Sequence, residues 1–466
     1  MRIPGLNSKN RLDQAGLALI GCIVAAWVLW MMPHPLSAIA AGLVPLAAIV
    51  CLRRPFLLVL AFVLFSFFRL HEVFPALYPL HIPQLLALAT LASLAWNLTV
   101  GTLRPVWCRE LTAFAAFFGL VTAGLFFATN RGEALASWQG TYVKIAVMVV
   151  AIVWLARGER ELKLVTRAVV VTGILVGGVA LHNKLGGIGL VEGTRVTIGR
   201  DIGSILGDPN DLALVLLFPA SFGLALLFTR AAGWPARFLG GVGFAVVLAA
   251  IVATQSRGGL LGIVAVAGVF AWRHVRSKSL LVAAGTIALV LLFAMAEVGD
   301  RSSGGALEEG IDESAMGRLH AWGAAVEMAM DNPLTGVGIN NFLSNYFAYS
   351  SFWDGRNHAV HSTWFGVMAE TGIIGFMAFA VMVVLVLRSA LWATTVLAPG
   401  RPRHAPEPYA MAQGVLAGLA GFMVSGTFLT MGFTWPLYIL LALTAAVAGL
   451  AREPSQINSH FESERR

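Results

Sequence analysis

The amino-acid sequence predicts an all-α fold, a polytopic membrane bundle of about 12–14 transmembrane helices. Of the 466 residues, 58% are hydrophobic and only 12% are charged, which is about half the charged fraction of an ordinary globular domain. The mean hydropathy is +0.78. Apolar runs of about 20 residues, the length that spans a bilayer as a helix, recur from one end of the chain to the other. These observations exclude a soluble multidomain protein.

Fourteen apolar segments are predicted to cross the membrane. The first is long enough to span and lacks a small-residue cleavage site, so it is interpreted as a transmembrane helix rather than a cleaved signal peptide. The third and the tenth segments are short and need not both cross the membrane, so the predicted number of transmembrane helices is 12 to 14. The segments lie at about 15–32, 36–52, 55–69, 82–100, 110–128, 139–156, 166–182, 211–229, 238–255, 259–272, 279–297, 363–387, 409–430 and 434–451.

The distribution of Lys and Arg predicts the orientation, because cytoplasmic loops carry an excess of these residues. With the N-terminus in the cytoplasm, most of the 32 basic residues fall on that side. A count that omitted one helix would move the later basic clusters outside. The predicted regions are a cytoplasmic N-terminus (1–14), a transmembrane bundle (15–297), a large outer loop (298–362), C-terminal transmembrane helices (363–451) and a cytoplasmic tail (452–466).

Polar residues are costly at membrane depth, and they mark functional sites or structural pairs. In this topology they gather at the outer face. Arg257 lies in a tight turn at 256–258, between two predicted spans. Its guanidinium group matches phosphate oxygens, and the glycines beside it let backbone N–H groups approach an anion. The alternative is an interfacial arginine that extends to lipid headgroups.

A second outer loop, at 183–210, contains Arg195 and Arg200. Either arginine could meet a polyanionic ligand, and Arg200 is favoured because it is nearer to the following helix. The Asp/Pro/Asn cluster at 207–211 predicts a turn and an N-cap for the span that begins near Leu212.

The large outer loop holds further candidates. Apolar residues recur at helical spacing over 314–331, which predicts an amphipathic helix with Arg318 near its start. His358 and His361 lie three residues apart at the entry to the next span. Each is either a packed polar group or a general base suited to neutral pH. A metal site is disfavoured, because cysteines are absent from this side and the nearby acidic residues follow no ligand spacing.

Two polar residues are predicted to lie within spans. Glu370 follows His361 by nine residues, which on an unbroken helix would place it about 13 Å deeper and on the opposite face. It is interpreted as capping, or pairing with, a polar group inside the bundle. Lys144, five residues into its predicted span, could reach the outer face or meet such a carboxylate.

In their order and spacing, these motifs resemble those of the O-antigen ligase and polymerase superfamily. They cover about residues 200–385, and the N-terminal half is similar only in being a bundle of apolar helices. The residues that carry the resemblance are Ser256-Arg257-Gly258-Gly259, Gly317-Arg318 with Trp322, Pro333 with Gly336, Gly338 and Phe342, His361-Ser362 with Glu370-Thr371-Gly372 and Gly375, and Gly207-Asp208-Pro209-Asn210-Asp211-Leu212-Ala213.

The resemblance implies a GT-C-like, metal-independent glycosyltransferase of the bacterial inner membrane, without a cofactor and with its active site facing the periplasm. Such enzymes move a glycan from an undecaprenyl-diphosphate carrier to an acceptor hydroxyl, on lipid A–core or on another lipid-linked glycan. Membrane lipids are expected partners and nucleic acid is not. The implied site has His361 as general base, Arg257, Arg200, Arg318 and Arg195 as candidates to bind the diphosphate, and Glu370, Lys144 and His358 in support.

A ligase is favoured, because the compact Ser-Arg-Gly-Gly and His-Ser…Glu-Thr-Gly pattern looks most like ligase sequences. A repeat-unit polymerase stays open, since up to fourteen spans is closer to polymerases, and a protein O-glycosylation ligase is a further variant. Outside the enzyme class, a transporter of lipid-linked sugars predicts polar residues near the midplane and paired broken helices. An assembly subunit without activity would not need both a histidine and several arginines at one face.

Overall fold

The computed structural model describes residue 23 and residues 53–295, 313–352, 355–401 and 404–452. The predicted spans at 15–32 (apart from residue 23) and 36–52 lie outside the described residues. So do the N-terminal segment 1–14 and the first part of the large loop.

The described chain is almost entirely helical, with one isolated β-bridge between Val191 and Arg195, so the all-α prediction is confirmed. The elements in the first half are α3 (Pro55–Phe67), α4 (Leu70–Val73), η1 (Pro75–Leu80), α5 (Ile82–Thr99), α6 (Arg109–Gly124), α7 (Arg131–Ser137), η2 (Trp138–Tyr142), α8 (Val143–Leu155), α9 (Glu159–Gly186), η3 (Arg200–Ile202) and η4 (Ile205–Gly207). Those in the second half are α10 (Pro209–Phe228), η5 (Arg230–Ala232), α11 (Trp234–Thr254), α12 (Arg257–His274), α13 (Lys278–Met295), α14 (Glu313–Asp331), α15 (Phe342–Tyr349), α16 (Thr363–Val396), α17 (Pro406–Ser425), η7 (Gly426–Phe428) and α18 (Trp435–Arg452).

Within the described residues, eight helical segments are long and apolar enough to cross a membrane, so the chain is a multi-pass membrane protein. Each predicted span from 55–69 onward coincides with a helix. The eight segments are α5, the continuous run from α7 through α8, α9, α10, α11, α16, α17 with η7, and α18.

The segment between the predicted spans at 110–128 and 139–156 is helical, because it contains α7, Arg131–Ser137. The side chain of Asn130 accepts a hydrogen bond from the backbone N–H of Glu133 at 3.2 Å, which starts α7 ahead of the apolar run. Asn followed three residues later by Glu is a helix-start signal. From there the chain passes through the π-helix η2 into α8 without a break.

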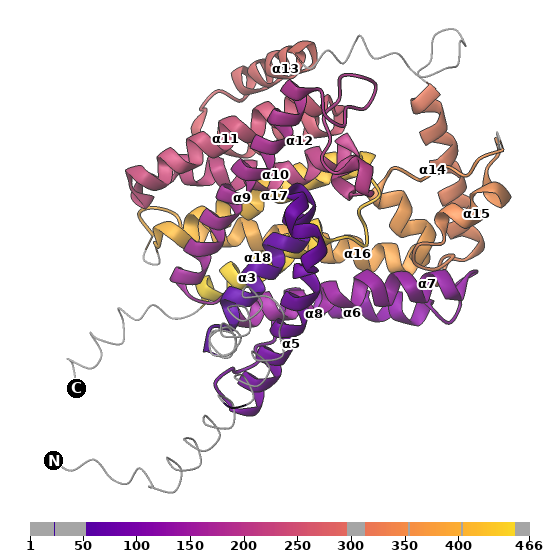
Figure 1. The fold of residues 1–466 in the computed structure, drawn as a ribbon, viewed down its shortest axis with the longest axis horizontal. Coiled ribbons are helices and arrows are strands. Elements are labelled where there is room, and N and C mark those ends of the chain that lie inside the picture. The colour runs from indigo at the N-terminus through magenta and orange to yellow at the C-terminus, as the bar shows by residue number, and fades with distance from the viewer. Residues whose placement is uncertain (1–22, 24–52, 296–312, 353–354, 402–403, 453–466) are drawn as a thin grey trace, which may run out of the picture.

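α10 forms the centre of the bundle and is largely buried. α11 and α17 pack against α10, α18 packs on α17, and α13 lies at the edge of the bundle beside α12 (Figure 1). α14 and α15 stand at one end, near α7. We call this the α14 end. A second, smaller hydrophobic cluster, separate from the main core, is built there from α14, α15 and the start of α16.

α16 is broken near the α14 end, at Gly372, whose φ of 69° and ψ of −174° are non-helical. A break leaves backbone groups without their partners within the helix. The glycine-rich turn after α14 supplies those partners. The N–H of Val337 donates to the carbonyl of Ala369 at 2.9 Å, and the carbonyl of Pro333 accepts from the N–H of Ile373 at 2.8 Å.

Two glycines make this close approach possible. A Cβ atom on Gly336 would lie 2.4 Å from the carbonyl oxygen of Ala369, and one on Gly372 would lie 2.6 Å from that of Pro333. Both glycines also have a positive φ, a backbone conformation that residues other than glycine rarely adopt. The Pro333…Gly336 turn and the Glu370-Thr371-Gly372 motif are therefore one structural unit, which we call the glycine interlock.

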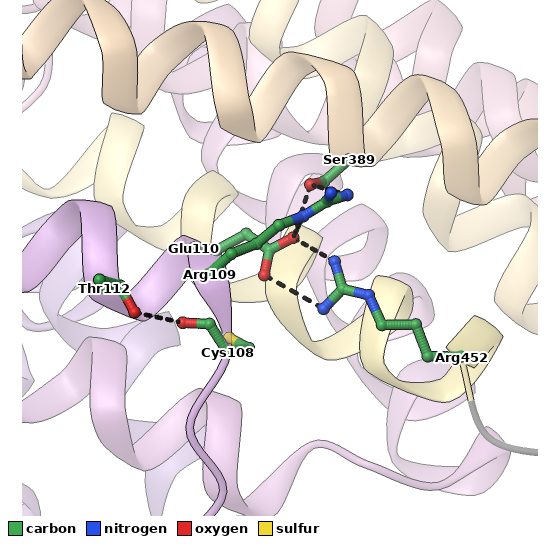
Figure 2. Close-up of polar contacts among 6 residues, drawn as sticks. All are labelled: Cys108, Arg109, Glu110, Thr112, Ser389 and Arg452. Atoms are coloured by element: carbon green, nitrogen blue, oxygen red, sulfur yellow. Dashed lines mark hydrogen bonds and ion pairs between the residues drawn. The ribbon is translucent and has the colours of Figure 1, made fainter.

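A buried ion-pair cluster ties three helices together farther along α16 (Figure 2). Glu110, which has no exposed surface, accepts hydrogen bonds from Arg452 at 2.6 and 3.3 Å and from Ser389 at 2.5 Å, while Arg109 lies 3.3 Å away. Gly372 and Ser389 are seventeen residues apart on α16, a helical rise of about 25 Å. The interlock and the cluster are thus separated by roughly the thickness of a bilayer's hydrocarbon core.

Candidate functional site

The loop between α9 and α10 carries two of the predicted arginines, and the structure treats them differently. Arg195 is only 5% exposed. Its Nε donates to the carbonyl of Thr254 at 3.3 Å and its Nη2 to Oδ1 of Asn210 at 3.0 Å, so its guanidinium group joins the end of α11 to the start of α10. Arg200 is exposed and donates to the carbonyl of Gly207 at 3.4 Å.

Arg257 is the first residue of α12. Ser256 caps this helix by accepting a hydrogen bond from the N–H of Gly259 at 3.1 Å, and the Arg257 side chain is exposed. A Cβ atom on Gly259 would lie 2.5 Å from the Cβ of Ala213, which is in the first turns of α10. Gly259 therefore lets the N-terminal turns of α10 and α12 pack side by side, which explains in part why the Ser-Arg-Gly-Gly and Gly-Asp-Pro-Asn-Asp motifs occur together.

η7 and the residues after it connect the start of α12 to the start of α16. Phe428 lies against Gly258, where a Cβ atom would be 3.6 Å from that of Phe428. The hydroxyl of Thr363, the first residue of α16, donates to the carbonyl of Leu429 at 2.8 Å. Arg257 and His361, which are far apart in sequence, are thus carried to the same end of the bundle.

His361 lies just before α16, outside the helix that Ser362 caps. Its φ is 44°, in the left-handed region that residues other than glycine adopt at a cost of about 1–3 kcal/mol, often at functional sites. The indole N–H of Trp322 on α14 donates to the carbonyl of Val360 at 3.1 Å, and its ring stacks on Phe365 at 5.0 Å. α14 therefore holds the segment on both sides of His361.

Three charged or titratable groups surround His361 within electrostatic range: Arg318 on α14, Asp208 at the start of α10, and His358. Partial burial lowers the pKa of His361, and the charge of Arg318 lowers it further. The Asp208 carboxylate acts in the opposite direction, and His358 makes a smaller contribution that lowers the pKa. His361 as a whole is still exposed.

Asp208 confirms the cap predicted for α10, because it accepts hydrogen bonds from the N–H groups of Asn210 at 2.7 Å and Asp211 at 3.3 Å. Its place near His361 was not predicted, since no local pattern relates the two residues. His358 packs edge-on against the ring of Tyr346, 5.5 Å between centroids. Among the described residues, no group of three or more His, Cys, Asp or Glu could hold a metal ion.

Glu370 is buried in the glycine interlock and acts as a cap, as the sequence predicts. Its carboxylate accepts a hydrogen bond from the N–H of Phe342, the first residue of α15, at 3.2 Å, and another from the backbone of Asn340. Glu370 thus joins α15 to α16 rather than facing His361. Lys144 is exposed on α8.

Residues 242–380 match a family model described as O-antigen ligase. No curated protein matches the chain. The matched region runs from within α11 to the middle of α16. It contains Arg257, Arg318, His361 and both halves of the glycine interlock, and it excludes the loop that carries Arg195 and Arg200.

Proposed function

We propose that this chain, a member of the O-antigen ligase and polymerase superfamily, is an O-antigen ligase that works in the bacterial inner membrane. Its donor is a glycan on an undecaprenyl-diphosphate carrier, and its acceptor is a hydroxyl group of lipid A–core at the periplasmic face. The observation that carries the proposal is the convergence of three distant motifs at the α14 end. Asp208 and Arg318 lie within electrostatic range of His361, and η7 packs against both the Ser256–Gly259 turn and the start of α16.

In the proposed reaction, the acceptor oxygen attacks the anomeric carbon of the donor sugar. The bond from that carbon to the diphosphate oxygen breaks, and undecaprenyl diphosphate leaves with the electron pair. His361 takes the proton of the acceptor hydroxyl. Its lowered pKa suits this role, because the ring is neutral at pH 7 and can accept a proton.

Negative charge grows on the diphosphate as the glycosyl bond breaks, and fixed positive groups stabilise it. We assign this role to Arg200, Arg257 and Arg318. The N-terminus of α12, which the neutral side chain of Ser256 caps, adds its partial positive charge. Arg195 would act indirectly, since its guanidinium group already bridges Thr254 and Asn210.

A transporter of lipid-linked sugars is the alternative from a different class, and it predicts broken helices near the midplane. The break in α16 instead lies near one end of the bundle, since about 25 Å of helix separates it from the Glu110 cluster. Its backbone groups are hydrogen-bonded to the turn in the glycine interlock. This arrangement favours a fixed site at one end of the bundle.

The surroundings of His361 predict opposite pH effects for two substitutions. Arg318→Gln removes a charge that lowers the pKa of His361, so the acid limb of kcat/KM should move to higher pH. Asp208→Asn removes a charge that raises this pKa, and because Asn also caps helices, the limb should move to lower pH. Shifts in the same direction, or none, would show that these groups do not act on the catalytic base.

Transfer by the purified full-length protein tests the proposal. Lipid-diphosphate-linked glycan is supplied with lipid A–core, with excess carrier-linked repeat, or with a serine-containing acceptor peptide, each with and without EDTA. Glycan on core, indifferent to EDTA, is the expected result. Chain elongation without core would make the protein a polymerase, and glycan on the peptide would make it a protein ligase. No transfer in any arm, with a folded protein, would overturn the enzyme assignment.

A further inference from the structure

A buried polar cluster joins the loop before α10 to the short helix α4, and the proposed reaction makes no use of it. Glu72 on α4 is 5% exposed and Ser204 in the loop is 8% exposed. The hydroxyl of Ser204 donates to Oε2 of Glu72 at 2.5 Å, across 132 residues of sequence. Arg69 also donates to both oxygens of this carboxylate, and His71 lies 3.4 Å from Oε1.

The element that carries Glu72 is anchored to the bundle. The rings of Phe67 and Phe68 at the end of α3 pack on Phe218 of α10, and α4 follows them directly. A buried carboxylate is costly unless it is paired and hydrogen-bonded. Glu72 has both kinds of partner, Arg69 as the ion pair and Ser204 as the hydroxyl donor.

Ser204 also forms hydrogen bonds that hold the turns on both sides of it in the loop. Its backbone N–H donates to the carbonyl of Gly199 at 3.0 Å, closing the turn that contains Arg200. Its hydroxyl also accepts from the N–H of Leu206 at 3.1 Å, which starts the turn η4 that ends immediately before Asp208.

The two turns are in contact with each other as well. A Cβ atom on Gly207 would lie 2.9 Å from the Cα of Arg200, so the backbones pack without room for a side chain. A displacement of Ser204 would consequently move Arg200 and Asp208 together.

We propose that Glu72, neutralised by Arg69, is a positioning residue that fixes Arg200 and Asp208 through Ser204. This inference rests on the proposed function, in which Arg200 binds the diphosphate and Asp208 lies near the catalytic base. Glu72 itself would touch neither substrate. A role in stability alone is the competing explanation, and an apolar packing contact would serve stability at least as well as a buried ion pair.

Ser204→Ala is the informative substitution. It breaks the link to the loop while the Arg69–Glu72 pair stays intact, whereas Glu72→Ala would leave Arg69 without its carboxylate and could unfold the segment. Ser204→Thr retains the hydroxyl group and serves as the conservative variant. Ser221→Ala is the matched control, because Ser221 is also buried and its hydroxyl donates within its own helix, α10, to the carbonyl of Phe218 at 2.8 Å.

The measurement is binding of undecaprenyl diphosphate to the full-length protein in nanodiscs, together with KM and kcat for a lipid-linked glycan. Ser204→Ala should raise both Kd and the donor KM about tenfold, the loss expected when a charged hydrogen bond is misplaced. kcat at saturating donor should fall less. Ser204→Thr and Ser221→Ala should have Kd and KM values close to those of the parent protein. The melting temperature of Ser204→Ala should stay well above the assay temperature, so that unfolding does not account for its weaker binding.

Unchanged Kd and KM in Ser204→Ala would overturn the inference, whether or not the melting temperature falls. The outcome is separable from that of the proposed function. If His361→Ala abolishes transfer while Ser204→Ala binds and turns over normally, only the positioning role is refuted. If His361→Ala keeps full activity, the site itself is misassigned.

Discussion

Replacing His361 with alanine or asparagine is expected to reduce glycan transfer by a factor on the order of 10²–10⁴, the usual contribution of a general base. Asparagine is the more stringent variant. It tolerates the left-handed backbone conformation, φ 44° at this position, so it should preserve the local fold while removing the proton acceptor. Both variants should still bind undecaprenyl diphosphate, because the arginines that we assign to it are unchanged.

The pH dependence of the parent protein provides a second test of His361. Its pKa is lowered by partial burial and by Arg318, so the neutral base persists to lower pH than in an ordinary histidine. The midpoint of the acid limb of kcat/KM should therefore lie below 6.5, the ordinary pKa of a histidine.

His320→Gln is a matched control for the loss of a histidine in the same region. This side chain is on α14 and stacks on Phe352 at 5.3 Å. Its substitution should leave transfer unchanged. A His361→Asn protein that is folded and fully active would refute the assignment of the base.

The helices could be predicted from the sequence because hydropathy and capping are local properties. The amphipathic pattern at 314–331 corresponds closely to α14, Glu313–Asp331, and the Asp/Pro/Asn cluster gave the start of α10. Where the local signal was a cap rather than an apolar run, as at Asn130, a helix was missed.

The division of labour among the arginines could not be predicted. Arg195 and Arg200 lie in the same loop, but Arg195 is buried and donates hydrogen bonds to Thr254, which is 59 residues away, and to Asn210. The role of Glu72 could not be predicted either, because the serine that binds it lies 132 residues farther along the chain. Such roles depend on tertiary contacts that no spacing in the sequence encodes.

The glycine interlock also depends on contacts between residues that are distant in the sequence. Substituting either of its glycines is expected to cause a large loss of stability. Gly336→Ala would place a methyl group 2.4 Å from the carbonyl oxygen of Ala369 and 2.5 Å from backbone atoms of Glu370 and Gly372, at a φ of 62°. Because backbone cannot move aside as a side chain can, we expect a loss of roughly 3 kcal/mol or more in stability. Thermal unfolding in detergent would measure it.

Gly323→Ala is the matched control for this substitution. Gly323 is on α14, and no atom lies within 4 Å of the position that a Cβ would take. Alanine favours a helix over glycine by about 1 kcal/mol, so this variant should be as stable as the parent protein or slightly more so. A Gly336→Ala protein that melts with the parent would mean that the turn does not pack into the break of α16.

The coupling between the two halves of the interlock can be measured directly. Gly372→Ala alone should be as harmful as Gly336→Ala, since its Cβ would lie 2.6 Å from the carbonyl oxygen of Pro333. Once either substitution has pushed the turn out of the break, the second has little contact left to lose, so the double variant should cost clearly less than the sum. Both single variants should also lose transfer, because the residues of α16 before the break, which follow His361, are held by this contact. Additive costs would show that the two glycines act separately, and normal transfer in a destabilised variant would show that the interlock does not support the site.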